Sequence, residues 1–314
     1  ESSRGCPFSC SYCLSSIDKK LRFRDLELVK EELQFFLDNK VPQVKFVDRT
    51  FNCSHVHAME IWKYLIAHDN GITNFHFEVA ADLLNEEEIA LIQTMRPGMI
   101  QLEIGVQSTN PATITEIHRK MDFKMVCEKV RKVQAGHNVH QHLDLIAGLP
   151  FEDYASFGKS FDDVYALRPQ QLQLGFLKVL KGSYMYDMAA EYGCEYQDKE
   201  PYEVLFTNWL SYEDVLRLKL VEEMVEVYYN SGQFIKTLPA AESLFATPFA
   251  FYEALGMFYE KQGYMEISHT RIRRYEILLE FLETLEPDKK EFYQELMIFD
   301  LYSRENLKNR PAWA

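Results

Sequence analysis

The residues of this chain whose types and spacing most clearly predict chemistry are three cysteines near its start. Cys6, Cys10 and Cys13 form the pattern C-x3-C-x2-C, with Gly5 and Pro7 beside them. Glycine and proline favour a loop over a helix, and a loop can fold three thiolates around one centre. Three thiolates suit an iron–sulfur cluster or a zinc ion. In a cluster of four irons, three protein ligands would leave one iron open to a small molecule.

The cysteine pattern alone leaves other interpretations open. These are a zinc knuckle, an unrelated ferredoxin-type site, and cysteines that only fill the core as small apolar residues. Zinc fingers usually combine two cysteines with a second pair of ligands, and no such second pair follows in this sequence. The pattern therefore favours a cluster over zinc without excluding zinc.

The elements that would position this loop alternate between strands and helices. Apolar alternation of period two predicts strands over residues 43–48, 74–80, 99–107, 139–146 and 170–180. Helical spacing predicts helices over residues 25–40, 54–69, 85–95, 111–136 and 153–167. This alternation is typical of βαβ units with a parallel sheet, wound into an open sheet or a barrel. Functional residues then belong at the carboxyl ends of the strands.

The second part of the chain has a different pattern. After about residue 200, Phe, Tyr, Leu and Glu dominate and helical periods continue to the end, most clearly over residues 211–230 and 270–285. We therefore predict an α/β domain over residues 1–185 and an all-α region over residues 186–314.

Composition narrows the classes of function. The 314 residues carry a formal charge of −14, whereas proteins that bind a phosphate backbone usually present a basic face, so nucleic acid is disfavoured as a partner. No apolar run approaches the roughly 18 residues needed to span a bilayer, and no signal peptide is visible. Six cysteines, three of them clustered, fit a reducing compartment. We expect a cytoplasmic protein without a membrane span.

The cysteine loop and the strands behind it resemble the radical S-adenosylmethionine (SAM) superfamily over roughly residues 1–183. The resemblance depends on the cysteine spacing, on Tyr12 before the last cysteine, and on the segments G-V-Q-S at 105–108 and D-L-I-A-G-L-P at 144–150. It implies a partial (β/α)6, TIM-like barrel whose first strand lies at or before the cysteine loop. It also implies that Cys6, Cys10 and Cys13 hold a [4Fe–4S] cluster whose open iron binds SAM.

The resemblance also implies residues that contact SAM. The second strand of these enzymes often ends in a Gly-Gly-acid motif that holds the SAM amino group, but here residues 47–52 read V-D-R-T-F-N. Asp48 could replace that acid, with a solvated turn aspartate as the alternative. Tyr12, Gln107 and Ser108 belong to segments that approach SAM. Gly148 and Leu149 belong to the strand that backs the adenine, where glycine allows close backbone approach.

The activity implied by the resemblance begins with reductive cleavage of SAM. The resulting 5′-deoxyadenosyl radical would abstract hydrogen from a small-molecule substrate, which the sequence does not identify. The enzyme would need a reductant such as a flavodoxin or ferredoxin.

The branch of the superfamily is a further expectation. The form D-x-x-F at 48–51 and the helical tail resemble the branch that carries an amino-terminal cobalamin-binding domain. We therefore expect this chain to be a fragment, with cobalamin for methyl transfer supplied by a domain outside it, because no D-x-H-x-x-G cobalamin motif occurs in the chain. The alternatives are an enzyme like the oxygen-independent coproporphyrinogen oxidases, an inert radical SAM-like scaffold, and a non-enzymatic zinc or iron–sulfur binding module.

Overall fold

The computed structural model describes residues 1–265, 267–305 and 310–314. The chain divides into two compact units, Glu1–Tyr212 and Glu213–Ala314. The boundary after residue 185, inferred from the change in sequence pattern, stays a prediction.

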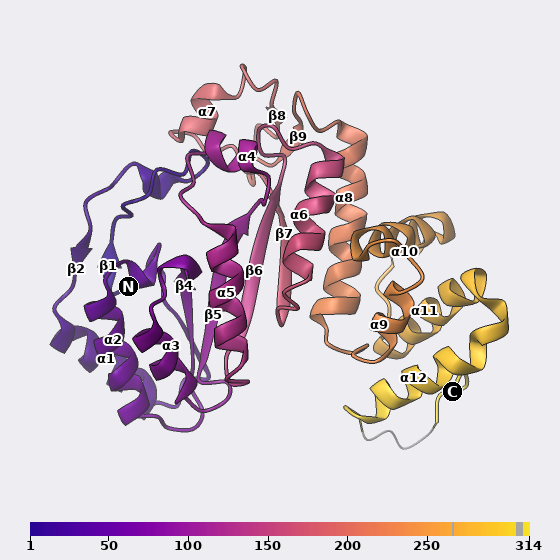
Figure 1. Ribbon diagram of the computed structural model, residues 1–314, viewed down its shortest axis with the longest axis horizontal. Helices are drawn as coiled ribbons and strands as arrows, with labels where there is room; N and C mark the ends of the chain where they lie inside the picture. Colours follow the sequence, from indigo (N-terminus) through magenta and orange to yellow (C-terminus); the bar gives the residue numbers. More distant parts are fainter. Residues whose placement is uncertain (266, 306–309) are drawn as a thin grey trace. The chain divides into compact units, whose positions relative to one another are not determined.

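The centre of the first unit is a parallel sheet of five strands (Figure 1). Its order follows the chain: β3 (Gln43–Lys45), β4 (Asn74–Val79), β5 (Ile100–Gln107), β6 (His140–Ala147) and β7 (Gln171–Phe176). Each strand overlaps a predicted one. The expected sixth strand is not in this sheet, because β1 (Ser3–Arg4), which precedes the cysteines, pairs antiparallel with β2 (Arg22–Phe23) in a separate two-stranded sheet.

Helices connect the parallel strands, and polar caps fix where they begin. The helix α1 (Leu26–Asp38) leads into β3, and the connecting helices are α2 (His55–Ala67), α3 (Glu86–Gln93), α4 (Pro111–Glu116), α5 (Phe123–Gln134) and α6 (Tyr154–Tyr165). Asn85 and Glu88 form a capping box at the start of α3. The single helix predicted over residues 111–136 is wrong. The chain turns between α4 and α5, and the Asp122 carboxylate caps α5 by accepting from the backbone N–H of Met125 at 3.1 Å.

The two faces of the sheet differ in chemistry because strand side chains alternate. Large apolar side chains on one face are fully buried, among them Phe75, Phe77, Leu102, Leu143 and Leu172. The other face carries polar and ionisable side chains instead. Parallel sheets are usually covered by apolar packing on both faces, so this polar inner face is available for a site.

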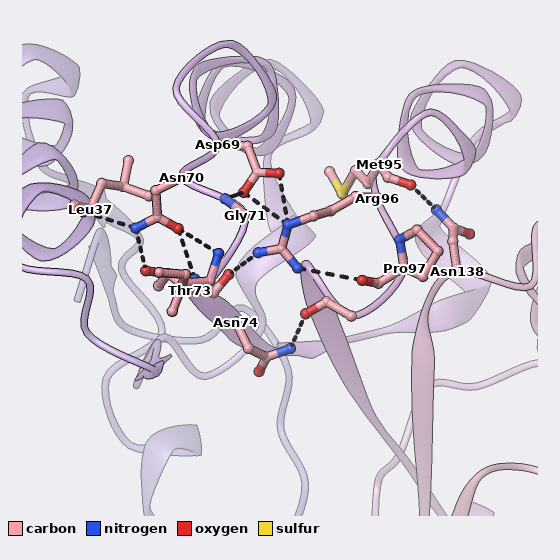
Figure 2. A network of polar contacts seen from close by, with 12 residues as sticks. Leu37, Asp69, Asn70, Gly71, Thr73, Asn74, Met95, Arg96, Pro97 and Asn138 are labelled. Atoms are coloured by element: carbon pink, nitrogen blue, oxygen red, sulfur yellow. Dashed lines mark hydrogen bonds and ion pairs between the residues drawn. The ribbon is translucent and has the colours of Figure 1, made fainter.

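A hydrogen-bond network joins the loops at the amino ends of β4, β5 and β6 (Figure 2). Arg96 Nε donates to Asp69 Oδ2 at 2.7 Å, and its Nη2 donates to the Thr73 carbonyl at 2.7 Å. Asn138 Nδ2 donates to the Met95 carbonyl at 2.8 Å. Residues 69–73, 95–96 and 138 are thereby tied together at the edge of the sheet opposite the strand carboxyl ends.

The first unit ends in short elements: α7 (Tyr184–Met188), β8 (Glu195–Tyr196) and β9 (Val204–Phe206). The hairpin of β8 and β9 is therefore an exception to the helical character predicted after residue 186.

The second unit is helical, as predicted. Its helices are α8 (Tyr212–Met224), a π-helix over Val225–Asn230, α9 (Thr237–Glu242), α10 (Pro248–Gln262), α11 (Arg271–Leu285) and α12 (Lys290–Tyr302). Buried aromatic side chains, including Tyr228, Phe234 and Phe251, form its core. Within the described residues, no helix is both long enough and apolar enough to span a membrane.

Candidate functional site

The cysteine loop is held by backbone hydrogen bonds to three distant segments. Cys6 N–H donates to the Asp18 carbonyl at 2.9 Å, Ser11 N–H donates to the Ile117 carbonyl at 2.9 Å, and Met185 N–H donates to the Ser11 carbonyl at 2.9 Å. Gly5 has a φ of +85°, and a Cβ there would lie 2.3 Å from the Lys20 carbonyl oxygen. Only glycine fits this turn, so the loop conformation is fixed just before the first cysteine.

The three cysteines line one cavity of about 240 Å³. Cys6 and Cys10 are buried, and Cys13 is half-buried. Burial raises the pKa of the Cys6 thiol. The remaining lining residues come from the cysteine loop, from the loop after β3, from the strands β4, β5 and β6, and from the segments after β4 and β5: Phe8, Tyr12, Ser15, Arg49, Thr50, Glu78, Val79, Ala80, Asp82, Glu103, Gly105, Gln107, Arg119, Lys120 and Asp144.

The shared cavity bears on which metal centre the thiols could bind. In the part of the chain that the structure describes, no three His, Cys, Asp or Glu side chains are grouped so as to hold a single metal ion. A tetrahedral zinc ion would bring its thiolates to within about 4 Å of one another, since each Zn–S bond is about 2.3 Å. In a cluster, each thiolate binds its own iron, so the ligands need not converge in this way.

Arg119 connects the cysteine loop to the sheet. Its Nη1 donates to Cys10 Sγ at 3.8 Å and to the Tyr12 hydroxyl at 3.3 Å. Its Nη2 donates to the Gly105 carbonyl on β5. Sequence reasoning missed Arg119 because it placed this residue inside a continuous helix. The helix-capping aspartate three residues later was the signal that could have revealed the turn.

Gln107 lies at the end of β5 with strained backbone geometry. Its φ is +74°, which is uncommon for a residue with a side chain and often marks a functional position. The register of β5 against β6 shifts between Gly105 and Gln107, so the bulge turns Gln107 into the cavity lining. Among the described residues, its buried Oε1 has no hydrogen-bond partner.

Asp48 is bound to the start of the chain and does not line the cavity. It is 1% exposed, so the alternative of a solvated turn aspartate is wrong. Its carboxylate accepts from the backbone N–H of Ser2 at 2.9 Å, from Ser2 Oγ at 2.8 Å and from Ser3 Oγ at 2.6 Å. These contacts fix β1 directly before the cysteine loop.

Ser108 also points away from the cavity. It is fully buried, and its hydroxyl donates to Glu152 Oε1 at 2.6 Å. Ser160 Oγ donates to the same oxygen at 2.8 Å. Burial raises the pKa of Glu152 to about 7, although the two serine hydrogen bonds act in the opposite direction.

Gly148 and Leu149 form the start of the loop after β6. Gly148 has a φ of +89°, and a Cβ there would lie 2.7 Å from Val204 Cγ1 on β9. Leu149 is fully buried. Of the residues predicted from sequence, the structure thus brings Cys6, Cys10, Cys13, Tyr12 and Gln107 together at the cavity. Asp48, Ser108, Gly148 and Leu149 lie in the surrounding framework.

Three acidic side chains of the strands line the cavity: Glu78, Glu103 and Asp144. Neither Glu78 nor Glu103 was identified from sequence, and Asp144 was included only as part of the segment at 144–150. Glu78 and Glu103 are opposite each other in the register of β4 and β5. Burial raises the pKa of Glu78, and the negative charge of Glu103 raises it further. Burial also raises the pKa of Asp144, and His142, whose Nε2 lies 3.0 Å from Asp144 Oδ1, opposes this rise. The alternation of polar and apolar residues in β4 and β5 was the signal that could have found them.

Comparison with known protein families matches two parts of the chain to different families. A family model described as "Radical SAM superfamily" matches residues 1–164. A second model, described as "Protein of unknown function (DUF4080)", matches residues 190–314.

Curated relatives match about half of the chain. The 2-(S-pantetheinyl)-carbapenam-3-carboxylate methyltransferase of Streptantibioticus cattleyicolor is 28% identical over 167 residues, which are 50% of this chain and 24% of that protein. The cobalamin-dependent radical SAM methyltransferase TokK of Streptomyces tokunonensis is 26% identical over 165 residues, again 50% and 24% of the two chains. The match therefore spans about a quarter of the length of these relatives.

A solved structure shows the same architecture. The radical SAM methyltransferase TsrM from Kitasatospora setae, determined with cobalamin and a [4Fe–4S] cluster bound, superposes with a TM-score of 0.55 at 16% identity. The alignment covers 67% of this chain and 43% of TsrM. The predicted fold, an α/β partial barrel of the TIM type with a helical carboxyl-terminal region, is confirmed.

Proposed function

We propose, from the premise that this chain belongs to the radical SAM superfamily, that its cavity binds a [4Fe–4S] cluster and SAM and starts radical chemistry on a small molecule. The observation that carries this proposal is the shared cavity of Cys6, Cys10 and Cys13 at the carboxyl ends of β4, β5 and β6. Three thiols that line one cavity can each bind one iron of a cluster.

The groups that we propose to hold SAM are side chains of the same cavity. Gln107 offers a buried Oε1 that has no partner within the described part of the chain. Glu78 and Asp144 line the cavity and can accept from the ammonium or the hydroxyl groups of SAM. Tyr12 lines the cavity next to the last cysteine.

The other residues predicted to contact SAM have a supporting role in this proposal. Asp48 fixes the segment before the cysteine loop through Ser2 and Ser3. Ser108 fixes the chain after β5 through Glu152. Gly148 and Leu149 provide the close packing of the loop after β6.

The protein supplies binding, orientation and electrostatics, while the cofactor carries the difficult chemistry. When bound, a reduced cluster supplies the electron that cleaves SAM and so starts the radical reaction. Arg119 places a positive charge next to Cys10 and so offsets the negative charge that thiolate ligands bring to the cavity. The same guanidinium holds the loop against β5, which keeps the ligands oriented.

Methyl transfer is the extension that the relatives support, since both curated relatives named above are methyltransferases and one is cobalamin-dependent by name. Cobalamin would come from a domain outside this chain, and the electron from a reductant such as a flavodoxin or ferredoxin. The clustered cysteines lead us to propose a reducing, cytoplasmic location.

Anaerobic reconstitution tests the proposed function. The protein is loaded with iron and sulfide, reduced in the presence of SAM, and assayed for 5′-deoxyadenosine by chromatography. Wild-type protein should bind about four irons and form 5′-deoxyadenosine, and Cys10→Ala should abolish both. Cys127→Ala is the matched control, because it removes a half-buried thiol on α5. This variant should still bind iron and form 5′-deoxyadenosine. Cleavage that persists in Cys10→Ala, or stoichiometric zinc binding in place of a cluster, would overturn the proposal.

A further inference from the structure

The polar inner face of the sheet is built in layers that the strand register defines. Glu78, Glu103 and His142 are neighbours on β4, β5 and β6. One layer closer to the amino ends, Lys45 and His76 are neighbours on β3 and β4. The interiors of TIM-type barrels are usually filled with bulky branched side chains. Ionisable groups in such a place cost free energy unless they are paired, so their presence calls for a function.

Glu103 is the member of these layers that other side chains hold most firmly. His76 Nε2 lies 2.8 Å from Glu103 Oε2, and Lys45 Nζ donates to the same oxygen at 3.0 Å. Lys45 Nζ also lies 3.8 Å from Glu78 Oε1. The His76 and Lys45 contacts lower the pKa of Glu103 to about 2 despite burial. Glu103 is therefore an oriented carboxylate that remains ionised at neutral pH.

Charged side chains of both signs line the cavity. Arg49, Asp82, Arg119 and Lys120 lie outside the strands, whereas β4, β5 and β6 contribute the carboxylates Glu78, Glu103 and Asp144. An ionised carboxylate can only accept hydrogen bonds. Lys45 Nζ and His76 Nε2 already lie against Glu103. The strands therefore offer a ligand a set of carboxylate acceptors.

We propose that Glu103 binds a protonated amine of the substrate, so that the substrate class is a small, cationic amine. This inference rests on the proposed function, because the amine belongs to the substrate of the same cavity. A carboxylate that Lys45 and His76 already orient is in position for a further donor, and a charge-assisted hydrogen bond to an ammonium is about twice as strong as a neutral one. A hydrophobic chain beside Glu103 would remove water from a buried carboxylate without offering it a further donor.

Binding of matched probes tests this inference. The probes are 1,5-diaminopentane, 1,5-pentanediol and glutarate, which share a five-carbon chain but differ in charge. Each is titrated calorimetrically into the anaerobically reconstituted protein without SAM. The diamine should bind at least tenfold more tightly than the diol, and glutarate should not bind. Equal binding of diol and diamine would overturn the inference.

Two substitutions assign the effect to Glu103. Glu103→Gln keeps the shape of the side chain and should weaken diamine binding at least tenfold. Lys45→Met removes a competing cation and should tighten diamine binding, so it tests the inference even if Glu103→Gln does not fold. Glu87→Gln, an exposed residue in the first turn of α3, makes the same charge change and should leave the affinity as it is.

The outcomes separate this inference from the proposed function. Unchanged diamine affinity in Glu103→Gln, or unchanged or weaker affinity in Lys45→Met, contradicts the amine site even when the wild-type protein forms 5′-deoxyadenosine. Absence of 5′-deoxyadenosine from the wild-type protein contradicts the proposed function, and selective diamine binding through Glu103 would still stand.

Discussion

Arg119 and Cys10 are 109 positions apart in the chain, yet Arg119 Nη1 donates to Cys10 Sγ at 3.8 Å. Arg119 lies in the turn between α4 and α5, and its other terminal nitrogen donates to the Gly105 carbonyl on β5. One side chain thus links a proposed cluster ligand, a helix turn and a sheet strand. The turn positions this side chain, because a continuous helix would carry it elsewhere.

Arg119→Met should make the cluster harder to reduce. A positive charge beside a ligand stabilises the reduced state, which is the more negative one, so its loss should shift the reduction potential downwards. We expect a shift on the order of 50 mV, since 59 mV corresponds to a tenfold change for one electron. Redox titration followed by electron paramagnetic resonance measures it.

Lys120→Met is the matched control, because it removes the same charge from an exposed neighbour in the cavity lining. A smaller shift in this variant would assign the effect to the Cys10 hydrogen bond. Equal shifts in the two variants would show that the reduction potential depends on the positive charge in the cavity and not on the hydrogen bond to Cys10.

Asp48→Asn should destabilise the segment before the cysteine loop. The amide has one oxygen acceptor in place of two and no charge, so it cannot satisfy the backbone N–H of Ser2 and both hydroxyl groups. Loss of charged hydrogen bonds at a buried site should cost about 2 to 3 kcal/mol. Urea denaturation measures the free energy of unfolding, and iron analysis reports whether the loop still holds a cluster. Undiminished stability with a tenfold weaker SAM affinity would instead indicate direct SAM binding by Asp48.

Glu152 should make stability fall as pH rises towards neutrality. Its pKa is about 7 in the fold and about 4.5 in the unfolded chain, so between these values the folded state binds more protons. Stability should therefore decrease between pH 4.5 and 7, by roughly 3 kcal/mol from this one group. Below pH 4.5 Glu152 is protonated in both the folded and the unfolded state, so its full contribution to the free energy of unfolding is present.

The isosteric variant Glu152→Gln should flatten this pH dependence. Urea unfolding at pH 5 and pH 8 compares the two proteins, and Glu87→Gln serves as an exposed control. A slope that is the same in Glu152→Gln as in the wild type would show that other groups carry it.

The strands and the cysteine loop could be predicted from sequence because their signals are local. The strand β5 spans residues 100–107, against a prediction of 99–107, since alternation of side chains is readable within a single segment. The Asp48 contacts could not be predicted, because their partners Ser2 and Ser3 lie about 45 positions earlier. Only the fold brings such residues together.

The sequence contained a signal for the turn between α4 and α5, but the helical spacing of the surrounding residues outweighed it. Residues 111–136 keep helical spacing on both sides of the turn, and the pattern therefore suggested one element. His118, with a φ of +55°, and the Asp122 cap interrupt it. For Gln107, the sequence indicated the residue but not its strained backbone, which arises from the bulge against β6.

The network around Arg96 has a consequence for strand register. Because it ties together the loops that enter β4, β5 and β6, those strands start at fixed positions relative to one another. A slip of one residue in β5 would exchange the places of Glu103 and Leu102, and so turn a carboxylate into the apolar packing and a leucine into the cavity. The guanidinium at the far edge of the sheet thereby protects the polarity of the site against misalignment during folding.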